Sequence, residues 1–373
     1  MIKLIDLTFY ANEEFDDPVE LVLSQQHSYG YIGFIKNRVN IKVVKHFVRD
    51  AKVWVEGIPY TLFRGLNKPG YVSFKTLRHI AAEKADVILV QGLGFPAQVL
   101  ILRLWLGKKT TIIAQHHAER PMHGIGRLLQ KMADKYIQGY LFTVWENAQE
   151  WFALNIIRDR RKYHELLELS TSFSPKNKQE ARLKKGIPQG DIFLWVGRLE
   201  ANKDPITVLQ GFAGYLENNP NALLYMAYQE NNLLAEVQGL VNAHPLLKRN
   251  VYLLGKIPHN ELQDWFSAAD FYFSGSHREG SGTALVEAMA CGCIPVVTNI
   301  PSFNKITCNG QYGFLYEAGN PQSLLKVLNN LPATGRGLLS AAIVTYFEEQ
   351  LSLKAIADGL YDICTILALG TQG

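Results

Sequence analysis

The chain alternates short apolar runs with longer amphipathic segments, and this alternation recurs in both halves. The apolar runs are rich in β-branched residues, as buried parallel strands are, while the longer segments repeat apolar residues at helical spacing. The pattern predicts strands at 2–9, 39–44, 52–55, 86–90, 110–114, 140–144, 192–197, 222–227, 251–255, 271–273 and 294–298. It predicts helices over 76–84, 97–106, 126–138 and 147–157, from residues 205, 233, 260 and 283, and over about 346–366. This order is typical of an α/β chain with two doubly wound parallel sheets.

A polar stretch between the two halves marks a domain boundary. The 373 residues suffice for two domains, each with its own hydrophobic core. Residues 170–180 are polar and contain Pro175, which is typical of a linker. We therefore expect one domain over 1–175 and a second over 176–345.

The net charge of +4 conceals an uneven distribution. Residues 1–186 carry 28 basic and 18 acidic side chains, +10, whereas residues 187–373 carry 10 and 16, −6. The basic clusters of the first half are Lys108 with Lys109, Arg120 with Arg127, Lys131 and Lys135, and Arg158 with Arg160, Arg161 and Lys162. The imbalance predicts an anionic membrane surface or an acidic acceptor as partner, or else only a solvated basic face. It does not predict nucleic acid, because no basic motif is interleaved with aromatic residues.

The apolar segments predict neither export nor a membrane span. No window approaches 18 uncharged apolar residues, and Lys3 and Asp6 interrupt the first apolar run. The four cysteines lie in the last quarter without the spacing of a zinc site, so we expect reduced thiols. These features predict a cytoplasmic protein.

The segment from Ser274 onward carries the clearest candidate chemistry. It follows a predicted strand, and Gly280 and Gly282 precede a helix from Thr283, whose unpaired N–H groups suit a phosphate. Glu279 and Glu287 flank this point, and a carboxylate can accept two hydrogen bonds from the paired hydroxyls of a sugar or ribose. The alternative is a helix end capped by Ser281 with two surface glutamates.

Two motifs carry a resemblance to a known family. Residues 279–296, Glu-Gly-Ser-Gly-Thr-Ala-Leu-Val-Glu-Ala-Met-Ala-Cys-Gly-Cys-Ile-Pro-Val, resemble the signature of glycosyltransferase family 4, which comprises retaining nucleotide-sugar transferases of the GT-B fold. Residues 196–205 resemble the family segment in which an arginine and a lysine, here Arg198 and Lys203, hold the donor diphosphate. Ser281 stands where the family commonly has phenylalanine, and the usual glycine-rich turn after the first strand is absent.

The resemblance implies an architecture and a division of labour. Two Rossmann-like domains would face each other across a cleft, with the acceptor on 1–175, the donor on 176–345, and the last helix, about 346–373, packing back on the first domain. Arg198, Lys203 and the helix end at Thr283 would neutralise the departing diphosphate, so we expect no metal and no cofactor. No Asp-x-Asp pair stands between the two motifs to carry a divalent ion.

The resemblance also implies a histidine near the donor sugar. Residues 110–121 run from a predicted strand into His116 and His117. His116 aligns best with the family histidine, and His117 remains an alternative. An imidazole here would hydrogen-bond the sugar or steady charge at the reacting carbon. The other interpretation is a structural histidine at a strand end.

The resulting hypothesis is a retaining hexosyltransferase that moves a sugar from a nucleotide-diphosphate donor to a glycan or lipid-linked acceptor. The resemblance implies that a donor phosphate oxygen takes the acceptor's proton, without a protein nucleophile. We expect a cytoplasmic enzyme, or one peripheral to the inner face of the cell membrane. The expected site residues are His116, His117, Arg198, Lys203, Glu279, Gly280, Ser281, Gly282, Thr283 and Glu287. The alternatives are a non-catalytic sugar-nucleotide or glycan-binding module, and a sugar-nucleotide epimerase or phosphorylase of the same fold.

Overall fold

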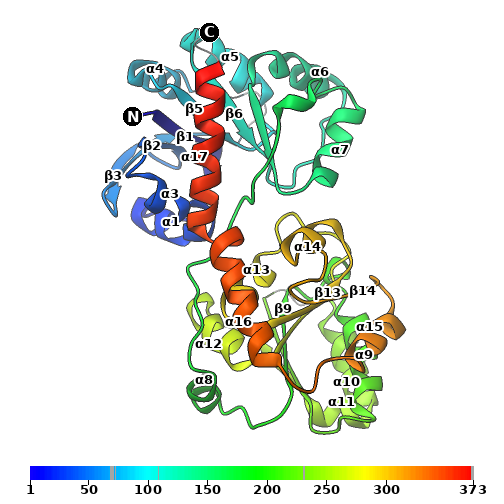
Figure 1. Cartoon of the computed structure of the whole chain (residues 1–373). Coiled ribbons are helices and arrows are strands. Elements are labelled where there is room, and N and C mark those ends of the chain that lie inside the picture. The colour runs from blue at the N-terminus through cyan, green and yellow to red at the C-terminus, as the bar shows by residue number, and fades with distance from the viewer. Residues whose placement is uncertain (68–70, 72, 108, 230–231, 371–373) are drawn as a thin grey trace. The chain divides into compact units, whose positions relative to one another are not determined.

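The protein consists of two compact units (Figure 1). The structure, a computed structural model, describes residues 1–67, 71, 73–107, 109–229 and 232–370. Unit 1 contains residues 1–170 and the last segment from Leu353, while unit 2 contains residues 171–352. The chain therefore enters unit 2 at Thr171, within the predicted linker and ahead of the expected boundary after residue 175.

Unit 1 is built on an eight-stranded sheet. Its strands are β1 (Lys3–Asn12), β2 (Asn40–Phe47), β3 (Ala51–Val55), β4 (Ile58–Arg64), β5 (Val87–Gln91), β6 (Thr111–Gln115), β7 (Gly139–Phe142) and β8 (Tyr163–Glu165). They lie in the order β3-β4-β2-β1-β5-β6-β7-β8, and only β3 and β4 pair antiparallel. The hydrophobic pattern did not predict β4 or β8. The sheet changes winding direction between β1 and β5, where doubly wound folds place ligands.

Helices cover both faces of this sheet. They are α1 (Pro18–Ser24), α2 (Gln26–Tyr29), α3 (Tyr31–Ile35), α4 (Phe74–Glu83), α5 (Pro96–Leu106), α6 (Gly124–Ala133), α7 (Trp145–Ala153) and α17 (Leu353–Gly370), with 3-10 turns η1 (Asp134–Tyr136) and η2 (Arg160–Lys162). Because side chains alternate along a strand, Leu4 faces a core with α1, α3 and α17, while Ile5 faces a core with α4, α5, α6 and α7.

The final helix α17 belongs to unit 1. Ile356, Leu360 and Cys364 are buried in the same core as Ile32 and Ile35 of α3. The pattern predicted one helix from residue 346, but a π-helical turn, η4 (Phe347–Leu351), and an extended Ser352 interrupt it. Among the residues described, no helix combines the length and apolarity needed to cross a bilayer.

Unit 2 is a six-stranded, all-parallel sheet. Its strands are β9 (Ile192–Gly197), β10 (Leu223–Tyr228), β11 (Val251–Gly255), β12 (Phe271–Ser274), β13 (Ile294–Thr298) and β14 (Phe314–Tyr316), in the order β11-β10-β9-β12-β13-β14. Its helices are α8 (Lys178–Lys185), α9 (Pro205–Leu216), α10 (Leu234–Ala243), α11 (Pro245–Asn250), α12 (His259–Ala268), α13 (Thr283–Ala290), α14 (Pro301–Ile306), α15 (Pro321–Leu328) and α16 (Arg336–Tyr346), with a 3-10 turn η3 (Ala201–Lys203). The winding direction changes between β9 and β12.

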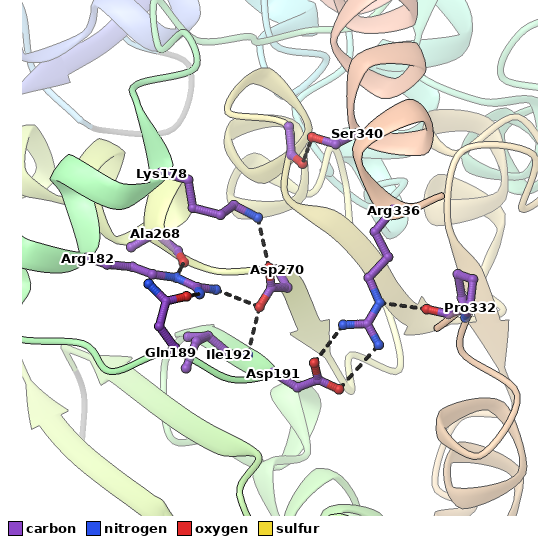
Figure 2. Close-up of polar contacts among 11 residues, drawn as sticks. Lys178, Arg182, Gln189, Asp191, Ile192, Ala268, Asp270, Pro332, Arg336 and Ser340 are labelled. Carbon is purple, nitrogen blue, oxygen red and sulfur yellow. Dashed lines mark hydrogen bonds and ion pairs between the residues drawn. The ribbon is translucent and has the colours of Figure 1, made fainter. Parts of the chain in front are cut away.

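Ion pairs fasten helices to the amino-terminal edge of the unit 2 sheet (Figure 2). Asp270, directly before β12, accepts from Lys178 at 2.9 Å and from Arg182 at 2.7 Å, both on α8. Asp191, directly before β9, pairs with Arg336 at the start of α16 at 2.6 Å. The carboxyl-terminal edge of the sheet is thus left available for ligands.

The charge difference between the sequence halves is smaller between the units. Unit 1 carries 24 basic and 19 acidic side chains, +5, and unit 2 carries 14 and 15, −1. The prediction assigned residues 176–185 to the basic half, yet these residues lie in unit 2. Their basic side chains pair there with Glu261, Asp264 and Asp270. Most of the difference in net charge between the sequence halves therefore disappears when the charges are counted by unit.

Candidate active site

A hollow of about 340 Å³ opens at the carboxyl-terminal edge of the unit 2 sheet. It lies where the winding direction changes, at the ends of β9, β10 and β12. Its lining residues are Val196, Gly197, Arg198, Lys203, Ala227, Tyr228, Gln229, Ile257, Leu262, Tyr272, Glu279, Gly282, Thr283, Ala284 and Phe303. Five predicted residues thus share one wall, and Gly280, Ser281 and Glu287 lie outside this lining.

Two loops with backbone contacts position the charged residues. The N–H of His277 donates to the carbonyl of Asn202 at 2.9 Å, and the Asn202 amide donates to the carbonyl of Arg278 at 3.0 Å. A Cβ at Gly275 would lie 2.7 Å from the carbonyl oxygen of Asp204. The glycine therefore allows the loop after β12 to approach the loop after β9 closely.

Glu279 is held between two donors. Its Oε1 accepts from the hydroxyl of Ser276 at 2.6 Å and forms an ion pair with Lys203. Arg198 stands on the same wall, with its guanidinium 2.9 Å from a Glu200 carboxylate oxygen. A carboxylate beside two cations can bind hydroxyl groups while the cations attract an anion.

The start of α13 forms the adjoining wall. Gly282 has φ +60° directly before Thr283, and a Cβ there would lie 2.9 Å from the ring of Phe303. Glycine is needed on both grounds, since the left-handed conformation and the close ring disfavour a side chain. The helix presents its first N–H groups, and its positive dipole end, to the hollow.

Glu287 lies deeper than the sequence suggested. It was predicted to flank the phosphate site, yet its side chain is buried and accepts from Nε2 of His259 at 2.6 Å. The hydrogen bond from Glu287 raises the pKa of His259 above its ordinary value. His259 stacks on Phe173, with 5.0 Å between ring centroids. Glu287 thus contacts His259 at the start of α12 and does not line the hollow.

The pattern missed the residues at the other end of the hollow. Tyr228 ends β10 and Gln229 follows it, while Ile257 follows β11 and Leu262 lies on α12. They form an apolar and aromatic wall that can bury a planar ring, with an amide to read its edge. Their position after parallel strands was the available signal, because ligands bind at the carboxyl ends of such strands.

In unit 1 the two histidines occupy different environments. His116 is buried, with Nε2 2.9 Å from the carbonyl of Glu119, Nδ1 accepting from the N–H of Ala118 at 3.3 Å, and its ring 4.8 Å from that of Phe142. His116, which aligned best with the family histidine, thus has both ring nitrogens engaged locally. His117, the alternative, has the exposed ring.

His117 belongs to a polar cluster at the winding change of unit 1. Its Nε2 donates to Gln91 at 2.7 Å, its Nδ1 lies 3.1 Å from a Glu168 carboxylate oxygen, and Gln91 donates to buried Asp6 at 2.7 Å. Burial lowers the pKa of His117, but the hydrogen bond and charge of Glu168 outweigh burial and leave the pKa raised. Glu168 thus stabilises the cationic form of the ring relative to a free imidazole. The pattern missed Asp6, Gln91 and Glu168, although polar residues at buried strand positions were a usable signal.

No metal site is evident in the described part of the chain, where no three His, Cys, Asp or Glu side chains gather to hold an ion. The four cysteines are free thiols, and all but Cys308 are buried.

The hollow lies within the part of the chain that matches a known family. Residues 177–334 match the family model described as glycosyl transferases group 1. This part of the chain is therefore similar in sequence to group 1 glycosyltransferases. It contains both predicted motifs and every residue of the hollow, so the predicted resemblance is confirmed here.

Relatives in sequence match this chain over part of their length. A D-inositol 3-phosphate glycosyltransferase of Streptosporangium roseum is 28% identical over 46% of this chain and 42% of its own length. An alpha-monoglucosyldiacylglycerol synthase of Streptococcus pneumoniae is 25% identical over 70% of this chain and 63% of its own length. The chain thus spans less than half of the first relative and less than two thirds of the second.

Solved structures match the whole chain. A glycosyltransferase of Rickettsia africae superimposes with a TM-score of 0.75 at 14% identity, covering 98% of both chains. The Anabaena protein HepE, in complex with UDP and glucose, gives 0.69 at 14% identity over 98% of this chain and 100% of its own. The prediction of an α/β chain with two doubly wound sheets, as in GT-B glycosyltransferases, is confirmed.

Proposed function

We propose that this chain is a retaining glycosyltransferase, which uses a nucleotide-diphosphate sugar as donor and a glycan or lipid-linked acceptor. The observation that carries the proposal is the wall of the unit 2 hollow, where Arg198, Lys203 and Glu279 surround the start of α13. A dianionic diphosphate and a polyol are the two chemical groups that this combination of cations, N–H groups and a carboxylate fits together.

Arg198 and Lys203 bind the diphosphate and stabilise it as the leaving group. Lys203 can do so while paired with Glu279, because an ammonium has three donors and a carboxylate oxygen uses one. The first N–H groups of α13 add fixed dipoles that need no reorganisation as charge develops on the leaving oxygen. These groups supply the neutralisation that a divalent ion provides in other transferases.

Glu279 orients the donor sugar, and the wall around Tyr228 receives the base. Ser276 and Lys203 fix the carboxylate of Glu279, so its remaining lone pairs point in a defined direction for sugar hydroxyls. The HepE complex, which contains UDP and glucose, supports a uridine donor for this hollow. The acceptor hydroxyl then attacks the sugar on the face that the diphosphate leaves. A phosphate oxygen of the departing diphosphate takes the proton of that hydroxyl.

The acceptor binds on unit 1. The cluster of Asp6, Gln91, His117 and Glu168 offers acceptors and a cationic donor for hydroxyl groups at the winding change. We assign the histidine role to His117, since the ring of His116 is buried and engaged. The names of the two relatives, a D-inositol 3-phosphate glycosyltransferase and an alpha-monoglucosyldiacylglycerol synthase, support a polyol on a lipid or phosphate carrier. Such an acceptor places the enzyme in the cytoplasm, at the inner face of the membrane.

The test is a transfer assay with product stereochemistry. The protein is incubated with UDP-, GDP- and ADP-linked sugars and with inositol phosphate, diacylglycerol or glucosyl-diacylglycerol in vesicles. Release of the nucleoside diphosphate reports turnover, and proton NMR of the new linkage reports its anomeric configuration. We expect one donor to react and the product to keep the donor's configuration. Inversion would overturn the retaining mechanism, and a donor that binds without turnover across all acceptors would favour the non-catalytic binding module.

A further inference from the structure

Unit 1 has an exposed apolar surface that the proposed chemistry does not use. We call it the α5–α6 surface and define it by Phe74, Leu104, Trp105, Ile125, Leu128, Met132 and Tyr136, all exposed. It spans the start of α4, the end of α5, the length of α6 and the turn η1. Single exposed apolar residues need no explanation, but a contiguous group does.

Helix α5 buries Val99 and Leu102 in the unit 1 core but also exposes apolar side chains on its outward side. Its two polar side chains point inward: Gln98 is 6% exposed and donates to the carbonyl of Tyr71 at 3.1 Å, while Arg103 is 8% exposed. Arg103 donates to the carbonyl oxygens of Gly107, Thr110 and Tyr136. Its outward residues include Leu104, 83% exposed, and Trp105. The outward side of an amphipathic surface helix normally carries polar and charged residues.

Helix α6 continues the apolar surface. Ile125, Leu128 and Met132 are spaced by three and four residues, so they lie along one side of the helix, and all are exposed. The opposite side carries Gln130 and Ala133, which are buried against the unit 1 core. The helical spacing of these three residues therefore gives α6 a continuous apolar side that is exposed.

These elements lie side by side. Helices α5 and α6 pack against each other, as Figure 1 shows. Phe74 of α4 and Trp105 of α5 have ring centroids 6.5 Å apart. Arg103 bonds the carbonyl of Tyr136 at 2.9 Å, which joins η1 to α5. The apolar side chains therefore form one surface.

The charges around this surface are of one sign. Residues 96–136 contain seven basic side chains and two acidic ones, Glu119 and Asp134. Asp134 is buried and paired with Lys162, and Glu119 accepts from the N–H groups of Leu93 and His117. Of the basic residues, Lys108 lies outside the described residues. Within those described, Lys109, Arg120, Arg127, Lys131 and Lys135 form no ion pair with a carboxylate.

We propose that the α5–α6 surface docks unit 1 on an anionic lipid bilayer. The apolar side chains, with Trp105 and Tyr136 among them, enter the headgroup region, and the surrounding lysines and arginines meet the lipid phosphates. A bilayer fits better than a protein partner, because it pairs an apolar phase with negative charge over the whole surface. This goes beyond the transfer reaction, since docking needs neither donor nor acceptor.

The proposed docking does not rely on the basic cluster of Arg158, Arg160, Arg161 and Lys162. Arg161 binds both oxygens of Asp159, Lys162 pairs with Asp134, and Arg160 lies 4.1 Å over the ring of Trp145. Three of the four are thus engaged within unit 1, and the apolar side chains that define the docking surface lie on α4, α5, α6 and η1.

The experiment is co-sedimentation of the full chain with vesicles of phosphatidylcholine alone or with added phosphatidylglycerol, without donor or acceptor. We expect binding to the anionic vesicles that weakens as salt rises. Leu104→Ser with Ile125→Ser should abolish it. Lys109→Gln, Lys131→Gln and Lys135→Gln together should lower the partition coefficient roughly fivefold per charge, or about a hundredfold in all.

The control variants change exposed residues of unit 2, and a comparison variant changes the basic residues in and next to η2. Leu183→Ser with Leu338→Ser removes equally exposed leucines, and Lys248→Gln with Arg249→Gln removes exposed charges; both should bind as the wild type does. Absence of wild-type binding, or loss only on changing the four η2-region residues to glutamine, overturns the proposal. So does self-association that the Leu104 and Ile125 changes abolish in the absence of vesicle binding. Donor turnover is measured separately, so that failure of docking does not bear on the proposed chemistry.

Discussion

At the scale of single residues, Glu279 and Lys203 define the chemistry of the unit 2 hollow. The ion pair holds the carboxylate and the ammonium beside each other at the wall of the hollow. Neither residue carries a large share of the fold, since both line an open hollow. Their loss should therefore appear in the reaction and not in stability.

Glu279→Gln should lower kcat/KM for the donor at least about tenfold, or roughly 1.4 kcal/mol. The amide keeps the volume but loses the charge that strengthens hydrogen bonds to sugar hydroxyls. Steady-state kinetics measures the change, with Glu217→Gln as control, because Glu217 is an exposed glutamate at the end of α9. Wild-type turnover by Glu279→Gln at an unchanged melting temperature contradicts the assignment.

The His259–Glu287 pair should stabilise unit 2 more at mildly acidic pH than at alkaline pH. The pKa of His259 is raised above 6.5 in the folded state, so folding takes up a proton. The stabilisation is complete below pH 6.5 and disappears as pH rises through the folded-state pKa. His259→Gln should thus lower the melting temperature more at about pH 6 than at about pH 9.

The matched control for this pair is Glu287→Gln, which retains the volume of the buried side chain. It removes the carboxylate that raises the pKa of His259, so adding His259→Gln to it should cost the same at both pH values. An equal effect of His259→Gln alone at both pH values, measured by thermal unfolding, would show that the pair does not titrate as described.

At the scale of elements, unit 2 was more predictable than unit 1. The loops after β9 and β12 contain both motifs, and continuous apolar runs such as 192–197 become strands there. In unit 1, the pattern did not predict β4 because Pro59 is its second residue. A proline has no N–H to donate within a sheet, so it is a signal against a strand. Glu56 and Gly57, both at positive φ, close the β3–β4 hairpin and were the overlooked signal.

Side-chain direction was the part of the site that spacing did not reveal. The four-residue spacing places Glu287 on the same side of α13 as Thr283, yet only contact with α12 decides that it meets His259. Likewise, His116 and His117 are adjacent in sequence, and a positive φ at Ala118 and the packing against Phe142 decide which ring is buried. Such choices depend on tertiary neighbours, which a local pattern does not contain.

Asp270 should be the most sensitive ion-pair residue at the amino-terminal edge of unit 2. It holds Lys178 and Arg182 of α8 and accepts from the N–H of Ile192 at 2.9 Å (Figure 2). Asp270→Ala leaves the buried Arg182 without its carboxylate, and such losses cost about 3–5 kcal/mol. Chemical denaturation measures the change. Asp159→Ala, which removes an exposed pair, should alter stability little; equal effects of the two would contradict this role.

At the scale of the whole molecule, each unit gathers polar groups where its sheet changes winding direction. In unit 2 these groups are cationic and suit a diphosphate, while in unit 1 they are mixed and suit hydroxyls. The same doubly wound fold thus carries two chemistries through its loops. Membrane docking by the α5–α6 surface would give unit 1 a second task.

Sugar transfer should continue in excess EDTA. Arg198, Lys203 and the start of α13 supply the positive charge that the leaving diphosphate requires. Initial rates are compared with EDTA, with added magnesium, and with neither. A rate that falls to background in EDTA and returns with magnesium would falsify metal independence.

Equilibrium binding of nucleoside diphosphates tests most directly whether the unit 2 hollow is the donor site. Isothermal titration calorimetry is carried out with UDP, GDP and ADP on the wild type, on Arg198→Gln with Lys203→Gln, and on a Lys248→Gln control. We expect one diphosphate to bind the wild type and the control equally, and the double variant at least about tenfold more weakly, since hydrogen bonds to charged groups contribute about 1.5–3 kcal/mol each. Binding of equal affinity to the double variant, or no binding of any of the three to the wild type, would contradict the donor site.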